Sequence, residues 1–164
     1  MGRYRAPAEK SSPYITKQGF DRIYAELGEL WKKRRRVTEK LKTAAAEGDR
    51  SENADYIYRK KQLREMDRRL GYLSRRVDAV TVVERIPADQ TKVFFGAWVT
   101  VADEADVETE YRIVGADEFD AAMNWISMDS PLGKTLLGKS LDCDVEVPLP
   151  SGPTTLYIAA IRYR

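Results

Sequence analysis

Two runs of mostly apolar residues at heptad spacing are the strongest constraint on the fold of this chain. The first comprises Phe20, Ile23, Leu27, Leu30, Val37, Leu41 and Ala44, and the second Tyr56, Arg59, Leu63, Met66, Leu70, Leu73, Val77 and Val80. Residues that repeat in steps of three and four line one side of a helix and form a coiled-coil seam. Gly48 lies in the short link between the runs and permits the chain to reverse. The sequence therefore predicts two antiparallel helices, the first beginning near Thr16, a capping residue.

The second half of the chain has a different pattern. Residues 94–101, 111–114, 124–128, 143–147 and 155–161 are rich in aromatic and β-branched side chains, which favours strands. Ser130-Pro131 is an N-cap followed by proline at the first helical position, so a short helix should begin there. This combination predicts a small α+β domain consisting of a twisted sheet with one helix.

These patterns divide the chain of 164 residues into four parts and place it in the α+β class. We expect a flexible tail over residues 1–13 and an antiparallel coiled coil over 14–83. A linker with Pro87 should cover 84–90, and the α+β domain 91–164.

Charge is distributed very unevenly along the chain. Residues 1–80 contain 21 Lys and Arg against 12 Asp and Glu, a net charge of +9, whereas residues 81–164 contain 7 against 14, a net charge of −7. Opposite signs indicate two modules with different partners. The basic half is a candidate nucleic-acid surface, and the alternative is a solvated helical face. Its cations include Lys60, Lys61, Arg64 and Arg68, which cannot face the seam.

Composition excludes several kinds of site. The chain has no histidine and one cysteine, Cys143, so an internal disulfide and His-based zinc or general-base chemistry are ruled out. Any metal must bind oxygen ligands, which suits Mg²⁺ or Mn²⁺. No apolar run approaches the ~18 residues that span a bilayer. We therefore expect a cytoplasmic protein that makes no membrane contact.

The segment Gly48–Tyr56 places two acidic side chains, Asp49 and Glu52, at the end of a basic hairpin. Their spacing fits a capping box, with Asp49 as N-cap and Glu52 at the third position. It also fits metal binding, and the two interpretations overlap because a carboxylate has two oxygens. Two carboxylates alone hold Mg²⁺ weakly. We therefore expect the tip to complete a metal site in another protein, with no metal bound stably by this chain alone.

Several motifs in this order resemble the bacterial Gre transcript-cleavage factors, and the GreB branch in particular. They are the tip segment 48–56, the basic segment 60–69, Val93–Val99, Arg112–Gly115 followed by Asp117-Glu118, and Ile126–Pro131. The resemblance extends from about Thr16 to the C-terminus.

The resemblance implies a coiled coil followed by an FKBP-like domain, in a monomer that binds the rim of the secondary channel of bacterial RNA polymerase. It also implies that Asp49 and Glu52 help to hold the second catalytic Mg²⁺ of the polymerase and position water. Ser51 and Asn53 would assist by hydrogen bonding. The basic face with Lys60, Lys61, Arg64 and Arg68 would hold the extruded 3′ end of nascent RNA. The chain would then be an accessory factor and not itself an enzyme.

Two alternatives belong to other functional classes. One is a Gre-fold regulator or inhibitor that binds polymerase without stimulating cleavage, for which an altered tip would be the sign. The other is an FKBP-type prolyl isomerase with a coiled-coil appendage, which a peptide isomerisation assay would detect.

Overall fold

The computed structural model describes residues 11–46, 53–149 and 152–164. These residues form two compact units. One is the hairpin of residues 20–80. The other combines the described residues up to Gly19 with Thr81–Arg164.

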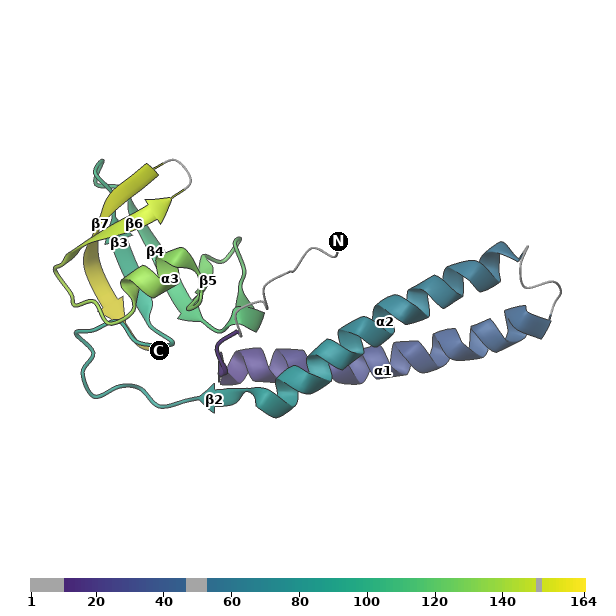
Figure 1. Ribbon diagram of the computed structural model, residues 1–164. Coiled ribbons are helices and arrows are strands. Elements are labelled where there is room, and N and C mark those ends of the chain that lie inside the picture. Colours follow the sequence, from purple (N-terminus) through teal and green to yellow (C-terminus); the bar gives the residue numbers. More distant parts are fainter. Residues whose placement is uncertain (1–10, 47–52, 150–151) are drawn as a thin grey trace, which may run out of the picture. The chain divides into compact units, whose positions relative to one another are not determined.

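The hairpin consists of helix α1 (Lys17–Ala46) and helix α2 (Ala54–Ala79), which lie side by side (Figure 1). At about 1.5 Å per residue, α1 is roughly 45 Å long. The members of the two predicted seams that are buried are Ile23, Val37, Ala44, Met66, Leu70 and Leu73. The other seam residues are half-buried, so the heptad interpretation is confirmed.

Ion pairs join the helices within the described part of the hairpin. Arg34 lies between Leu30 and Val37 at the one charged position of the first seam, and it donates from Nε to Asp67 of α2 at 2.5 Å. Arg69 of α2 binds both carboxylate oxygens of Glu26, at 2.7 and 2.8 Å. Half-exposed pairs of this kind contribute about 1 kcal/mol or less. Their main effect is therefore to fix the register of α1 against α2.

Thr16 begins α1 as predicted, because its Oγ1 accepts a hydrogen bond from the Gly19 amide at 3.0 Å. The same hydroxyl donates to Glu118, whose side chain is fully buried. Glu118 also accepts from the amides of Thr16 and Gly115, at 3.0 and 2.9 Å. This carboxylate therefore anchors the start of α1 within the second unit.

A pair of short strands lies where the sequence predicted only coiled coil. Strand β1 (Tyr14–Thr16) pairs in parallel with β2 (Thr81–Val83). Residues 14–16 and 81–83 consequently belong to the second unit rather than to the hairpin. Burial drives the arrangement, because Ile15 is completely excluded from solvent.

The main sheet has five strands in the order β5-β4-β3-β7-β6. They are β3 (Trp98–Ala102), β4 (Glu108–Val114), β5 (Trp125–Ser127), β6 (Asp144–Leu149) and β7 (Gly152–Arg162). Neighbours are antiparallel except β4 and β5, which are parallel. A short 3₁₀ helix, η1 (Ala116–Glu118), follows β4.

Helix α3 (Pro131–Leu136) covers part of the sheet, and its N-cap Ser130 accepts from the Gly133 amide at 3.0 Å, as predicted. The core between them contains Val93, Ala97, Val99, Val101, Ile113, Leu136, Val145, Val147 and Ile158. The α+β class is thus confirmed, while the specifically FKBP-like fold stays a prediction. The strand expected over residues 94–101 begins only at Trp98, because residues 94–96 form a turn in which Gly96 has a φ of 84°.

No helix within the described ranges is both long and apolar enough to cross a membrane.

Candidate functional site

Of the four predicted tip residues, only Asn53 lies within the described part of the chain. Asp49, Ser51 and Glu52 fall outside it, so their roles remain predictions.

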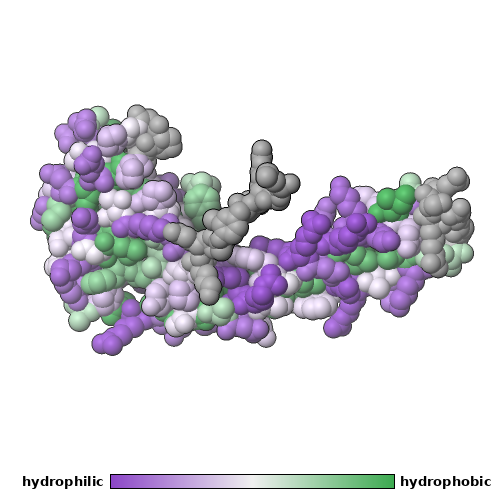
Figure 2. All heavy atoms as spheres, viewed as in Figure 1, coloured by the Kyte–Doolittle hydropathy of each residue, from purple (hydrophilic) through white to green (hydrophobic). Residues whose placement is uncertain are grey.

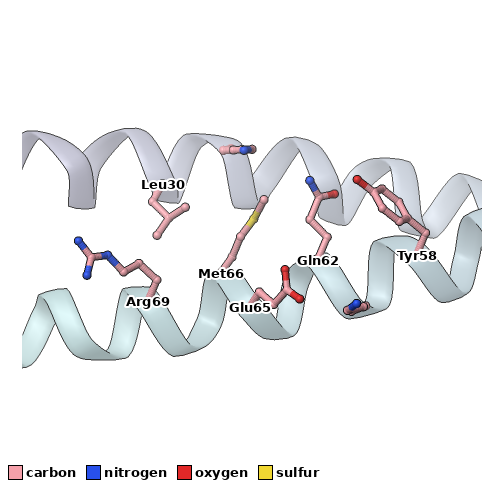
Figure 3. Close-up of a pocket in the computed structure, with 8 residues that line it drawn as sticks. Leu30, Tyr58, Gln62, Glu65, Met66 and Arg69 are labelled. Atoms are coloured by element: carbon pink, nitrogen blue, oxygen red, sulfur yellow. The ribbon is translucent and has the colours of Figure 1, made fainter.

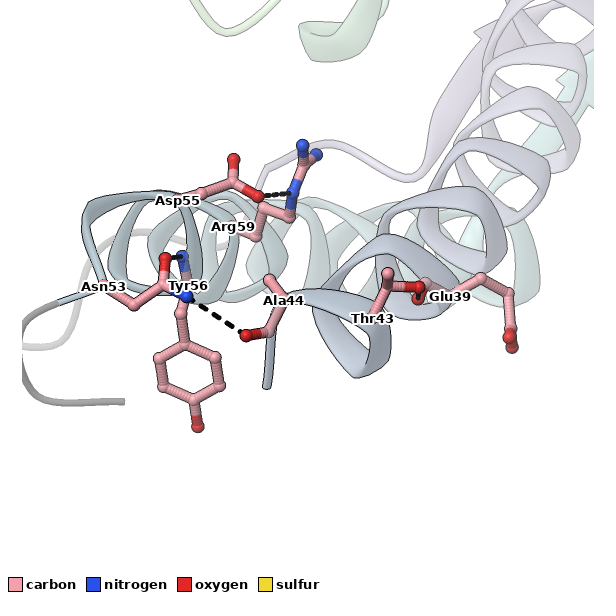
Figure 4. Close-up of polar contacts among 7 residues, drawn as sticks. All are labelled: Glu39, Thr43, Ala44, Asn53, Asp55, Tyr56 and Arg59. Carbon is pink, nitrogen blue, oxygen red and sulfur yellow. Dashed lines mark hydrogen bonds and ion pairs between the residues drawn. The ribbon is translucent and has the colours of Figure 1, made fainter. Parts of the chain in front are cut away.

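Asn53 joins the two helices at the tip end of the hairpin (Figure 4). It is the N-cap of α2, with φ −82° and ψ 100°, and its Oδ1 accepts from the Tyr56 amide at 3.0 Å. Its Nδ2 donates to the carbonyl oxygen of Ala44, in the last turn of α1, at 3.1 Å. Helix ends leave such amides and carbonyls without intrahelical partners. The Asn53 side chain therefore satisfies a backbone amide of α2 and a backbone carbonyl of α1, and it links the two helices.

The position of this cap corrects one interpretation of Asp49 and Glu52. A capping box at the start of the second helix would need Asp49 as N-cap, but Asn53 is the N-cap of α2 and Tyr56 is at the third position. Asp49 and Glu52 both precede Ala54, the first residue of α2. Capping α2 therefore does not account for either carboxylate.

The first turn of α2 carries a local charge pair. Asp55 accepts from Arg59 Nε at 2.8 Å (Figure 4), and an acidic group in the first turn suits the helix dipole. Arg59 was the polar member of the second seam. The pair with Asp55 explains how this half-buried arginine is accommodated there.

The four predicted RNA-binding cations are all exposed and lie on one side of α2. At about 100° per residue, Lys60, Lys61, Arg64 and Arg68 span an arc of roughly 100°. Lys61, Arg64 and Arg68 line a shallow hollow with Ile57 and Glu65. Lys60 instead places its ammonium 5.9 Å from the centre of the Tyr56 ring. Figure 2 shows hydrophilic side chains projecting from the visible face of the hairpin.

A second groove lies on a neighbouring side of the hairpin (Figure 3). Its volume is about 370 Å³, and it is lined by Leu30 and Lys33 of α1 with Tyr58, Lys61, Gln62, Glu65, Met66 and Arg69 of α2. Sequence reasoning did not identify this groove. Within α2 its residues recur at helical spacing, but its α1 wall depends on the register of the two helices.

Electrostatics distinguish the cations of this groove. The bond and charge of Arg69 lower the pKa of Glu26, so Arg69 is already neutralised by a carboxylate. Lys33 and Lys61 also line the groove, and within the described residues neither has an acidic side chain at ion-pair distance. These two ammonium groups are therefore available to an anion.

Two tryptophans of the second unit have a cation against their rings. Trp125 is buried, and the Arg112 guanidinium lies between it and Trp98, 4.5 and 5.2 Å from the ring centres. Burial lowers the pKa of Arg112. Because cations already lie against these two indole rings, the rings are not open surfaces on which a base could stack.

Among the described residues, no group of three or more acidic, histidine or cysteine side chains is placed to hold a metal ion.

Sequence comparison assigns both parts of the chain to one family. The profile for the N-terminal region of GreA/GreB transcription elongation factors matches residues 13–82, and the profile "Transcription elongation factor, GreA/GreB, C-term" matches residues 88–163. This chain belongs to the GreA/GreB family of transcription elongation factors.

Relatives named transcription elongation factor GreB are similar to the chain over nearly its whole length. The protein from Xanthomonas axonopodis pv. citri is 52% identical, with 99% of this chain and 98% of that protein covered. The protein from Pseudomonas aeruginosa is 50% identical, with the same coverage. A solved GreA/GreB structure from Nitrosomonas europaea is 22% identical, covering 93% of this chain and 100% of that one, with a TM-score of 0.42.

Proposed function

We propose that this chain is a transcription elongation factor that binds RNA polymerase through its secondary channel and stimulates endonucleolytic cleavage of the 3′ end of backtracked RNA. Its membership of the GreA/GreB family supports the proposal, as does its similarity to proteins named GreB. The motifs at residues 48–56 and 60–69 point to the same branch. Such a factor acts in the cytoplasm, where bacterial transcription takes place.

In this proposal Asp49 and Glu52 are carboxylate donors to Mg²⁺ in the polymerase active centre. Carboxylate oxygens are suitable ligands for this hard cation, and two of them leave most of its coordination sphere to water and phosphate. In a two-metal site of this kind, one ion would activate water and the other would stabilise the leaving oxygen. The chain itself contributes the two carboxylates and the hairpin that carries them. The remaining ligands belong to polymerase, so the factor is not a nuclease.

The observation that carries the proposal is the cap at Asn53. A structural role for Asp49 and Glu52 was the main rival to a chemical one, and α2 begins with a different cap. Asn53 also ties α2 to the Ala44 carbonyl, next to the segment that contains both carboxylates. These two hydrogen bonds support a structural role for Asn53 at the tip end of the hairpin, and its assistance to the chemistry stays part of the proposal.

Transcript cleavage in stalled elongation complexes tests the proposal. The tip double variant, Asp49→Asn with Glu52→Gln, should bind polymerase and keep its helix content while cleavage is lost. A control variant, Glu39→Gln with Asp78→Asn, removes the same charge from exposed sites of the hairpin and should cleave like wild type. Naked RNA with Mg²⁺ should remain intact. Binding without cleavage by the wild type would instead support a non-cleaving regulator.

A further inference from the structure

Tyr58 differs from the other aromatic side chains of the hairpin. It is 63% exposed, and within the described residues neither a cation nor another ring lies against its face. The other hairpin aromatics all have such a neighbour: Phe20 with Tyr24, Arg34 over Trp31, Lys60 over Tyr56, and Arg69 over Tyr72. An uncovered phenol ring at the edge of a groove is a surface on which a flat ligand can stack.

The groove beside Tyr58 combines apolar and polar walls. Leu30 extends from α1, while Met66, Gln62 and Tyr58 extend from α2 toward it (Figure 3). Tyr58, Gln62, Glu65 and Arg69 follow one another at steps of four, three and four, so they form a single stripe along α2. A volume of about 370 Å³ is enough for one flat heterocycle of a small ligand.

The chemistry of these walls favours a nucleobase over an isolated phosphate. A phosphate needs cations and amide donors and gains nothing from Leu30 and Met66. The Glu65 carboxylate would repel it, but can accept hydrogen bonds from the amino group of a base. The Gln62 amide both donates and accepts, as a base edge requires. Lys33 and Lys61 supply positive charge for the phosphates next to that base.

We propose that Tyr58 is a stacking residue for one nucleobase of single-stranded RNA, with the base in this groove and its neighbouring phosphates on Lys33 and Lys61. The site shares Lys61 with the basic face but differs in having an open aromatic ring, which Lys60, Arg64 and Arg68 do not offer. Sequence-tolerant binding of single strands combines a basic groove with such a ring. That the RNA is the extruded 3′ segment rests on the proposed function.

The location of Tyr58 fits this ligand. It follows Asn53 by five residues, which places it about 7 Å along α2 from the tip end of the helix. RNA that passes the tip would therefore meet Tyr58 before it reaches Arg64 and Arg68.

Direct binding to RNA tests the site. Anisotropy of a labelled single-stranded oligoadenylate, measured with the full-length protein at low salt, should report about tenfold weaker binding for Tyr58→Leu, within the range of a lost base stack. Tyr58→Phe keeps the ring and should bind like wild type. Tyr24→Leu is the control, because Tyr24 is 60% exposed on the same hairpin but lies outside the groove.

An oligomer with the same phosphates but abasic sugars separates the two parts of the ligand. Wild type and Tyr58→Leu should bind it equally, and more weakly than wild type binds oligoadenylate. Equal binding of oligoadenylate by wild type and Tyr58→Leu would overturn the proposal. The proposal would also be overturned if Tyr58→Leu lost as much affinity for the abasic oligomer as for oligoadenylate. The same holds if the wild type bound the abasic oligomer as tightly as oligoadenylate.

Cleavage assays separate failure of this site from failure of the proposed function. The tip double variant should bind oligoadenylate normally, because it leaves the groove intact. Binding of polymerase without cleavage by the wild type would refute the proposed function, and normal cleavage by the tip double variant would refute its carboxylate mechanism. Either outcome would leave the base site standing. Wild-type RNA binding by Tyr58→Leu, together with loss of cleavage in the tip double variant, would refute the base site alone.

Discussion

Asn53 is the residue that links α1 and α2 at the tip end of the hairpin. Its amide uses both polar atoms, accepting from the Tyr56 amide and donating to the Ala44 carbonyl. An ionised aspartate at this position could cap α2 but has no hydrogen to donate to α1. Asparagine is therefore suited to serve both helices, next to the segment for which we propose carboxylate donation.

Replacing Asn53 by alanine should destabilise the hairpin by about 0.5–2 kcal/mol, the usual cost of a lost cap. Asn53→Asp keeps the acceptor and should lose less. Urea unfolding gives the free energies, and amide exchange at Tyr56 should accelerate in the alanine variant only. Equal protection of Tyr56 in both variants would argue against the cap.

At the scale of elements, the two helices are held in register by the Glu26–Arg69 and Arg34–Asp67 pairs. Arg69 lowers the pKa of Glu26, so this pair stabilises the folded state above the ordinary pKa of glutamate and loses its effect as pH falls through the lowered value. Glu26→Gln should therefore cost about 1 kcal/mol or less at neutral pH. In strong acid, the variant and wild type should unfold at the same temperature. A difference that persists in acid would show that packing, not charge, is responsible.

The basic face of α2 is the second feature at this scale, and its proposed role is to guide RNA. Changing Lys60, Lys61, Arg64 and Arg68 to glutamine should impair cleavage in deeply backtracked complexes more than in those displaced by one or two nucleotides. The affinity of the variant for single-stranded RNA should also depend less on salt. The slope of log affinity against log salt concentration should become shallower by roughly 0.7 for each lost phosphate contact. The control changes Lys32, Lys40, Lys42 and Arg75, which are also exposed. Equal defects for both kinds of complex at every salt concentration would exclude a guiding role.

At the scale of the whole molecule, sequence patterns predict the hairpin and the α+β unit because their signals repeat. The heptad spacing of apolar residues continues over many residues in each helix. Ser130-Pro131 is a strong signal for the start of a helix. Strands β1 and β2 were missed because three residues are too few to show alternation. The cap at Asn53 was missed because Asp49 and Glu52 match a capping box equally well. The Tyr58 groove could not be predicted, since Leu30 and Lys33 reach it only through the register of α1 against α2.

In the proposed function, this chain donates carboxylates to a metal in another protein. The Mg²⁺ concentration needed for half-maximal transcript cleavage in a stalled complex tests it most directly. Wild type should lower that concentration well below the value for polymerase alone, because Asp49 and Glu52 add ligands to the ion. The tip double variant should restore the value for polymerase alone. An unchanged Mg²⁺ requirement with wild type, despite faster cleavage, would contradict the account.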